Sequence, residues 1–319
     1  MSPSRKPDET RDGVDLTNLD QPLFDGADAT KRDLVDHLDA LSDRILPELR
    51  GRPLSVIRVH RGQEAFMQKN VPKYAPDFVQ TVTFWAETSK REVAYALCDD
   101  RPTLLWFGNQ RAVEYHPTLV RADDPEHPTH LVLDLDPPEG DGFAAAVAAA
   151  RLVRQVLVDL DLACVVKTSG AKGVHVYVPV AGATLEEAAW ATRAIAARAA
   201  ALDPDLATTA FVKDEREGKV FVDATRVGSA TVVAAFSPRV RPGAPVSFPV
   251  SWDDLDDVRP TDFTLHTVAD RIGDAGPWLD SLPTDQAVPT VLLAEGREIE
   301  PGRVQAMHEG KRRKRAAES

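Results

Sequence analysis

Three aspartates at the ends of apolar runs could hold divalent cations. Asp134 and Asp136 alternate with leucines in the run 131–136, and Asp223 ends a second apolar run, 219–223. In a strand, residues two apart face the same side with Cα atoms about 6 to 7 Å apart, which suits a pair of cations spaced about 4 Å. Oxygen ligands favour Mg²⁺ or Mn²⁺ over Zn²⁺. The acids therefore predict a two-metal site for phosphate chemistry.

The structural alternative to this metal site stays open at this point. Isolated Asp-x-Asp pairs are common at strand ends, and Asp223 could instead cap the turn that leads to Gly228. An acid in a sheet interior is costly unless it is paired or metal-bound, which favours the metal site.

A glycine-rich turn, 169–173, lies between these acids in the sequence. It carries Ser169 and Lys172 and is followed by His175. Its two glycines let backbone N–H groups approach an anion, which is typical of a triphosphate cradle. It is not a P-loop, because the Gly-x4-Gly-Lys-Ser/Thr spacing is absent and a strand follows. Alternation points His175 away from the valine face of that strand, toward a ligand, although a lone strand histidine is often structural.

The elements that must position these residues follow from the periodicity of the chain. Apolar residues at three- and four-residue steps predict one helix from Thr30 to about Gly51, and alternation predicts strands at 54–60, 81–87 and 91–97. Beyond His130 the order β-α-β-β-α-β-β predicts an α+β sheet with helices on one face. Its expected elements are strands 131–136, 163–167, 174–180, 219–224 and 231–236, and helices 143–160 and 185–202.

Composition limits the partners that the chain can bind. The net charge of −12 excludes a uniform basic surface, so nucleic-acid binding must be local. The segment 51–75 has five Arg or Lys residues against one acid, with aromatic residues interleaved, which predicts a DNA-facing patch; a solvated face is the alternative. The two cysteines indicate neither a disulfide framework nor a zinc site. The absence of an apolar span or signal peptide indicates no membrane partner and a cytoplasmic location.

The three motifs together resemble one known family. The segments 133–137, 168–175 and 220–223 closely resemble the polymerase domain of bacterial DNA ligase D, a member of the archaeo-eukaryotic primase superfamily. Shorter matches at 16–18, 51–53, 75–77 and 113–116 fall in the same order, so the resemblance covers about residues 16–282. It implies a stand-alone relative of that domain. No Lys-x-Asp-Gly ligase signature is present, so sealing a break would need a separate ligase.

This resemblance implies a fold and a domain division. The expected fold is α+β: a primase-like catalytic lobe with an RRM-like sheet and helices, plus an N-terminal α/β lobe. The boundaries expected are a disordered N-terminus at 1–13, the N-terminal lobe at 14–130, the catalytic lobe with a C-terminal extension at 131–302, and a basic disordered tail at 303–319.

The resemblance also implies roles for individual residues. Asp134 and Asp136 would bind both metals, and Asp223 the metal nearest the primer 3′ oxygen. The residues implied to contact the nucleotide are Ser169, Lys172, His175, His116, Arg239 and Arg216. The expected DNA contacts are Lys31 at a gap 5′-phosphate, Phe66 against the template, and the basic residues Arg52, Arg58, Lys69 and Lys73. Two positions depart from the family: Gln21 stands where a phosphate-binding lysine is expected, and 228–230 lacks another lysine.

The implied activity is templated nucleotidyl transfer in a bacterial cell, associated with the nucleoid. The family implies use of Mn²⁺ or Mg²⁺, ribo- or deoxynucleoside triphosphates, and primer–template or gapped DNA, in end joining with Ku and a ligase. De novo priming uses the same acids and stays open. A third alternative is a non-catalytic module that docks a ligase or Ku, and the presence of all three acids argues against it. A fourth is a two-metal nuclease, and the 169–175 cradle argues against that.

Overall fold

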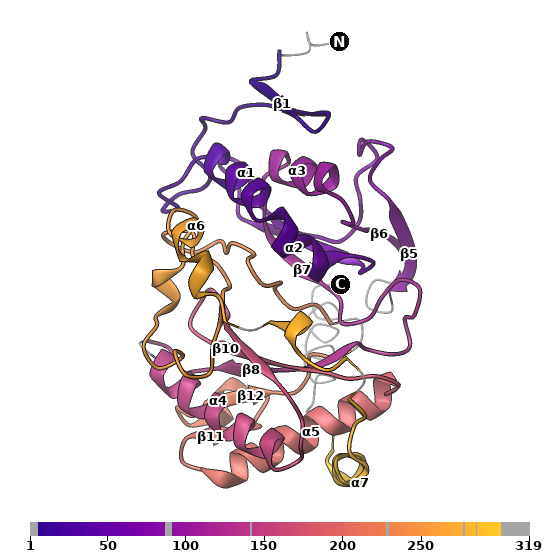
Figure 1. Ribbon diagram of the computed structural model, residues 1–319, viewed down its shortest axis with the longest axis vertical. Coiled ribbons are helices and arrows are strands. Elements are labelled where there is room, and N and C mark those ends of the chain that lie inside the picture. The colour runs from indigo at the N-terminus through magenta and orange to yellow at the C-terminus, as the bar shows by residue number, and fades with distance from the viewer. Residues whose placement is uncertain are drawn as a thin grey trace, which may run out of the picture.

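The computed structural model describes residues 6–86, 91–140, 142–227, 230–276, 278–284 and 286–300. The expected basic tail at 303–319 lies outside these ranges. So does most of segment 228–230, where a lysine of the family is lacking. The two larger β-sheets lie in opposite halves of the molecule, and the chain between residues 231 and 268 returns from the second of them to the first (Figure 1). Within the described ranges no helix is long and apolar enough to cross a membrane.

The first sheet has five strands and carries helices α1–α3. Its strands follow the order β4-β3-β6-β5, with β7 also paired to β3. A small hairpin of β1 and β2 precedes it. The elements are β1 (Glu9–Arg11), β2 (Val14–Leu16), α1 (Lys31–Ala40), α2 (Ser42–Leu49), β3 (Leu54–Arg58), β4 (Phe66–Gln68), β5 (Thr81–Ala86), β6 (Arg91–Ala96), α3 (Arg101–Asn109) and β7 (Ala112–Pro117).

Two expectations for the N-terminal region are wrong. Disorder was expected over 1–13; residues 1–5 lie outside the described ranges, but β1 is held by Arg11, whose guanidinium pairs with Asp36 (2.6 Å) and Asp39 (3.1 Å) of α1. One helix was expected from Thr30 to Gly51, but the backbone of Leu41 leaves the helical region (φ −105°, ψ 14°) and separates α1 from α2. Both halves keep their apolar stripes buried, which is why the periodicity did not reveal the break.

The second sheet has six strands, in the order β11-β12-β8-β10-β9-β13. Its central part runs β-α-β-β-α-β, with β8 between β10 and β12 and every central pair antiparallel, which is a split βαβ arrangement. Helices α4 and α5 pack on each other and on one face of the sheet, leaving the other face free for polar side chains. The elements are β8 (His130–Asp136), α4 (Phe143–Val158), β9 (Val165–Thr168), β10 (Val174–Pro179), α5 (Leu185–Leu202), β11 (Ala207–Thr208), β12 (Val220–Asp223) and β13 (Pro249–Val250).

The bridging segment, residues 231–268, connects the two sheets. The strand expected at 231–236 is wrong: toward β7 this stretch makes an isolated bridge, Thr118 to Thr231, and two further backbone hydrogen bonds, while Phe236 N donates to the carbonyl oxygen of Ser247 (2.7 Å). Phe236 then turns the chain with a positive φ of 62° and accepts a hydrogen bond at its carbonyl from His37 Nε2 of α1 (2.9 Å). The β-branched pattern of 231–236 is thus satisfied by the edge of the other sheet, and residues of both sheets join one buried core. Helices α6 (Val268–Arg271) and α7 (Thr290–Glu298) follow.

Candidate active site

Strand register places a row of polar residues across the open face of the six-stranded sheet. Asp223 lies opposite Asp134, Asp134 opposite His175, and His175 opposite Lys167. Directly paired residues of neighbouring strands project to the same face, so these four side chains form one line, the acid row. Asp136 lies two residues further along β8, on the same face.

A cavity of about 790 Å³ opens beside the acid row. Its wall includes the bridging segment and the glycine-rich turn as well as the sheet. Of the residues expected to bind metal or nucleotide, those that line it are Asp134, Asp136, Asp223, Ser169, Lys172, His175, Arg216 and Arg239. The structure therefore brings eight of these nine residues together, and His116 is the exception.

Arginine side chains neutralise the carboxylates. Arg226 bridges two of them, with Nη2 3.3 Å from Asp134 Oδ2 and Nε 3.2 Å from Asp223 Oδ2. Asp136 pairs with Arg216 (3.0 Å) and lies 3.4 Å from Lys172 Nζ. The sequence did not single out Arg226; its place three residues after Asp223 was the available signal.

Burial acts on the two inner carboxyls in the same direction but with different outcomes. Burial opposes ionisation of Asp134, yet His175, Arg226 and Lys167 outweigh it and hold the pKa of Asp134 well below its usual range. Burial raises the pKa of Asp223 above its ordinary value, and Arg226 and Thr225 offset this only in part. Asp134 is therefore a ready anion, whereas Asp223 gains most from a nearby cation.

The donor set fits magnesium or manganese by its chemistry. The described residues contain no group of three or more His, Cys, Asp or Glu side chains already arranged around a metal position. Three carboxylates nevertheless line one cavity, and the positively charged guanidinium of Arg226 pairs with two of them. Carboxylate oxygens are hard ligands, which Mg²⁺ and Mn²⁺ prefer.

The glycine-rich turn is packed tightly against the sheet and the bridging segment. A Cβ on Gly173 would lie 2.4 Å from the carbonyl oxygen of Leu135, and one on Gly170, where φ is +67°, would lie 2.8 Å from Ser247 N. Inside the turn, Ser169 Oγ accepts a hydrogen bond from Gly173 N (3.1 Å). Only glycine fits at these two positions, so the sequence signal reports a close approach of backbones.

His116 acts on this site through a neighbour. Its Nε2 lies 2.8 Å from Glu114 Oε2, which also pairs with Arg239 Nε (3.0 Å), while Glu114 Oε1 accepts from Val240 N (2.8 Å). Burial opposes ionisation of Glu114, but these partners lower its pKa to about 2. Glu114 thus holds Arg239 at the cavity wall. The sequence analysis gave Glu114 no role of its own, although it lies within the family match at 113–116.

Several expected DNA contacts are used inside the protein. Lys31 is only 3% exposed and donates to Asn109 Oδ1 (2.6 Å). Arg52 is buried and donates to Thr129 Oγ1 (2.6 Å), and Arg58 is buried and donates to Gln68 Oε1 (2.6 Å). These three cations therefore hold the N-terminal region together rather than present charge on its surface.

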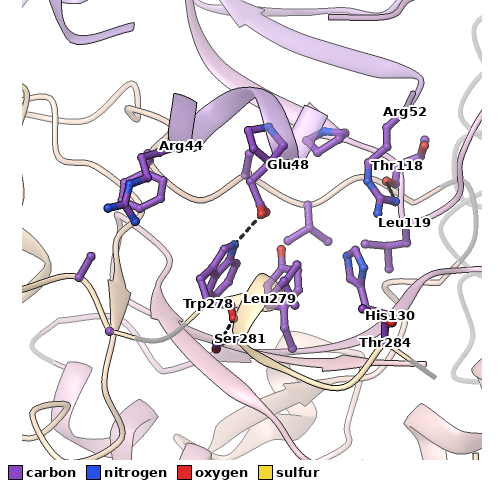
Figure 2. Close-up of a pocket in the computed structure, with 18 of the residues that line it drawn as sticks. Arg44, Glu48, Arg52, Thr118, Leu119, His130, Trp278, Leu279, Ser281 and Thr284 are labelled. Atoms are coloured by element: carbon purple, nitrogen blue, oxygen red, sulfur yellow. Dashed lines mark hydrogen bonds between the residues drawn. The ribbon is translucent and has the colours of Figure 1, made fainter. Parts of the chain in front are cut away.

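A second cavity, of about 540 Å³, separates α2 from the six-stranded sheet. Figure 2 shows Trp278 donating its indole N–H to Glu48 on one side, with Arg52 and His130 on the other. Tyr177, on the same sheet face as His175, contributes to its wall. Arg52 thus points between the two sheets.

The remaining expected DNA contacts are exposed. Phe66 is 38% exposed and stacks on His60 with ring centroids 5.3 Å apart. Lys69 and Lys73 are exposed nearby. The exposed aromatic side chains of this region also include Tyr74 and Phe78, with Met67 beside them. We call residues 61–78 the aromatic–basic surface.

Comparison with known proteins identifies the family. The model of the LigD primase-polymerase domain matches residues 30–278. The chain belongs to this family, whose members are nucleotidyltransferases. Its structure superposes on the polymerase domain of Mycobacterium tuberculosis Ligase D, solved in complex with DNA, with a TM-score of 0.75 and 30% identity over 90% of this chain and 99% of that one.

Two similar proteins are named for non-homologous end joining. The chain is 33% identical to the bifunctional non-homologous end joining protein LigD of Bacillus subtilis, over 88% of this chain and 46% of that protein. It is likewise 33% identical to the multifunctional LigD of Mycobacterium tuberculosis, over 86% of this chain and 38% of that protein. The chain spans less than half the length of these relatives.

Proposed function

We propose that this chain adds nucleotides to the 3′ hydroxyl of a DNA primer under the direction of a template, using two Mg²⁺ or Mn²⁺ ions. The observation that carries the proposal is the convergence of Asp134, Asp136 and Asp223 with Ser169, Lys172 and Arg239 on one cavity. The split βαβ sheet, with its acids on the face away from the helices, is consistent with an RRM-like catalytic lobe of the primase type. Membership of the LigD primase-polymerase family gives the reaction class.

In this proposal the three aspartates would hold the two ions. Bound there, the ions would lower the pKa of the attacking hydroxyl and neutralise charge on the triphosphate. Lys172 and Arg239 lie on the cavity wall to bind phosphate oxygens, and Glu114 keeps the guanidinium of Arg239 directed there. Arg216 and Arg226, which pair with Asp136 and Asp134, also line this cavity and would take up phosphate contacts there. The 3′ oxygen displaces pyrophosphate from the α-phosphorus.

The DNA would approach through the aromatic–basic surface. Phe66 offers a face on which a template base can stack, and Lys69 and Lys73 offer phosphate contacts. Recognition of a gap 5′-phosphate is weakened, because Gln21 is uncharged and the neighbouring Lys31 is buried. Primer–template DNA is therefore the proposed substrate, with end joining alongside Ku and a separate ligase as the setting.

Primer extension tests this proposal directly. A 5′-labelled primer on a template is incubated with Mn²⁺ and with ribo- or deoxynucleoside triphosphates separately, beside Asp134→Ala/Asp136→Ala. Templated extension that is lost in the variant supports a polymerase and ranks the two sugars. Dinucleotide synthesis on a primer-free strand would reveal a primase, and degradation of the primer a nuclease. If the chain binds DNA but incorporates no nucleotide under any condition, the alternative of a non-catalytic docking module is supported.

A further inference from the structure

Lys167 is a buried lysine beside the catalytic face with no role in the mechanism above. It lies at the end of the acid row, opposite His175, and its side chain is fully buried. Nζ lies 2.9 Å from His175 Nδ1 and also donates to Ser247 Oγ. An unpaired buried lysine is costly, so these two contacts explain how it is accommodated.

The directions of the hydrogen bonds around Lys167 follow from what each group can do. The hydroxyl of Ser247 donates to the carbonyl oxygen of Thr168 (2.8 Å), so its oxygen accepts from Lys167. A lysine ammonium has three donors and no acceptor, so His175 Nδ1, 2.9 Å from Nζ, accepts from Lys167. A neutral imidazole whose Nδ1 accepts carries its hydrogen on Nε2, the ring nitrogen that lies 3.3 Å from Asp134 Oδ1.

We propose that Lys167 is a positioning residue that fixes the tautomer of His175, so that an Nε2–H donor faces Asp134 and the incoming nucleotide. The relay runs from the backbone carbonyl of Thr168 through Ser247, Lys167 and His175 to Asp134. Ser247 belongs to the bridging segment, so this segment contributes to the catalytic face. The consequence for nucleotide binding rests on the proposed polymerase function, but the tautomer itself does not.

The direct test is nitrogen NMR of the His175 ring in the full chain. In the wild type we expect Nε2 to show the signature of a protonated nitrogen and Nδ1 that of an unprotonated one. In Lys167→Met, which keeps the length of the side chain and removes the donor, we expect a mixture of both tautomers. A wild type with a protonated Nδ1, or a variant with unchanged ring signals, would overturn the proposal.

A matched control separates positioning from packing. Val166→Ala lies next to Lys167 on β9, is fully buried and faces the opposite side of the sheet. It should lower the melting temperature while leaving the His175 signals unchanged. If Lys167→Met does not fold, Ser247→Ala removes the acceptor that holds Nζ, and the same appearance of a second tautomer is expected. Unchanged signals in a folded Ser247→Ala would then count against the relay.

Kinetics give a second and independent readout. Loss of one oriented donor is expected to raise the KM for nucleotide about tenfold in Lys167→Met with little change in kcat. In a His175→Gln background the same substitution should add nothing, because Lys167 acts only through the imidazole. An equal rise in KM in the wild-type and the His175→Gln backgrounds would refute an action of Lys167 through the imidazole. An inactive wild type with the expected tautomer would refute the polymerase function and leave the relay standing.

Discussion

The acid row and the basic stretch 51–75 are both conspicuous charge clusters in the sequence, yet the structure treats them differently. The three aspartates and the cationic side chains that pair with them line one cavity, although they come from different strands and from a turn. The basic stretch divides: Arg52 and Arg58 are buried, whereas Lys69 and Lys73 are exposed.

This difference has a simple physical origin. Alternation in a strand fixes which face a side chain occupies, so two acids two residues apart must share a face. A long side chain in a loop or at a strand edge has no such constraint, and its cation can turn inward to satisfy backbone carbonyls. Arg52, for example, donates to the carbonyl oxygen of Thr118 (3.2 Å). Charge patterning therefore predicts the acid row better than it predicts the DNA surface.

The largest effect on activity is expected when one carboxylate of the acid row is removed. Asp134→Asn should reduce nucleotide incorporation by about 10³-fold or more, because bound cations supply several kcal/mol of transition-state stabilisation. Single-nucleotide incorporation on a primer–template measures this. The exposed acid in Asp159→Asn is the control for the change in net charge, and an equal loss there would show that the acid row is not special.

The glycine-rich turn should show a smaller effect that is confined to nucleotide binding. Lys172→Ala is expected to raise the KM for nucleotide by about 10- to 100-fold, the value of a charge-assisted hydrogen bond, with kcat little changed. Steady-state incorporation across nucleotide concentrations gives both constants. Lys213→Ala removes a lysine that pairs with Glu139 (2.9 Å) but does not line the cavity. A similar rise in KM in Lys213→Ala would show that the effect comes from the overall electrostatic field of the protein and not from a contact of Lys172 with the nucleotide.

Salt dependence sharpens the division within the basic stretch. Lys69→Ala/Lys73→Ala should lower the slope of log affinity against log salt by about 2, one for each lost phosphate contact. Arg58→Met should leave this slope unchanged and instead lower the free energy of unfolding by about 1 to 3 kcal/mol, since buried hydrogen bonds are lost. DNA titrations at several salt concentrations, with urea unfolding alongside, measure both. The opposite assignment would place Arg58 on the DNA surface.

The last expected effect is confined to acid pH and concerns His37, where α1 meets the bridging segment. Burial lowers the pKa of His37 to about 4, while the Phe236 carbonyl opposes the shift. The unfolded chain therefore binds more protons between about pH 6.5 and 4, so the free energy of unfolding should fall as pH falls through this window, by up to ~1.4 kcal/mol per pH unit from this residue. In His37→Gln the decline should be shallower by that amount. Identical urea-unfolding profiles for both proteins would exclude a contribution from His37.

Much of the six-stranded sheet was predictable because its local signals agree. Helix α5 spans the predicted 185–202, since Thr184 and Glu187 form a capping box at its start. Sequence alternation likewise placed Asp134 and Asp136 on one face of their strand, and His175 away from the valine face of its own strand. The strand register then brings all three to the same face of the sheet. By contrast, the pattern at 231–236 was that of a strand, but it cannot say which sheet it joins.

The missed residues share a different property. Lys167 and Glu114 contact site residues that are distant in sequence or on another strand, and Arg226 reaches two carboxylates from a loop. The motifs assigned none of the three a role. Their roles depend on the strand register and on the path of the bridging segment. Tertiary contacts decide both, so these residues became visible only in three dimensions.

The path of the bridging segment also has a consequence for biosynthesis. Residues that complete the packing of β7 and α1, among them Ser237 and Phe236, are translated only after the whole split βαβ unit. Tyr115 N, which donates to Ser237 Oγ (2.9 Å), therefore waits for its acceptor while the ribosome makes the intervening chain, a delay of seconds. During that interval the nascent N-terminal half exposes an unfinished core, so a truncated message would release a chaperone client rather than a folded fragment.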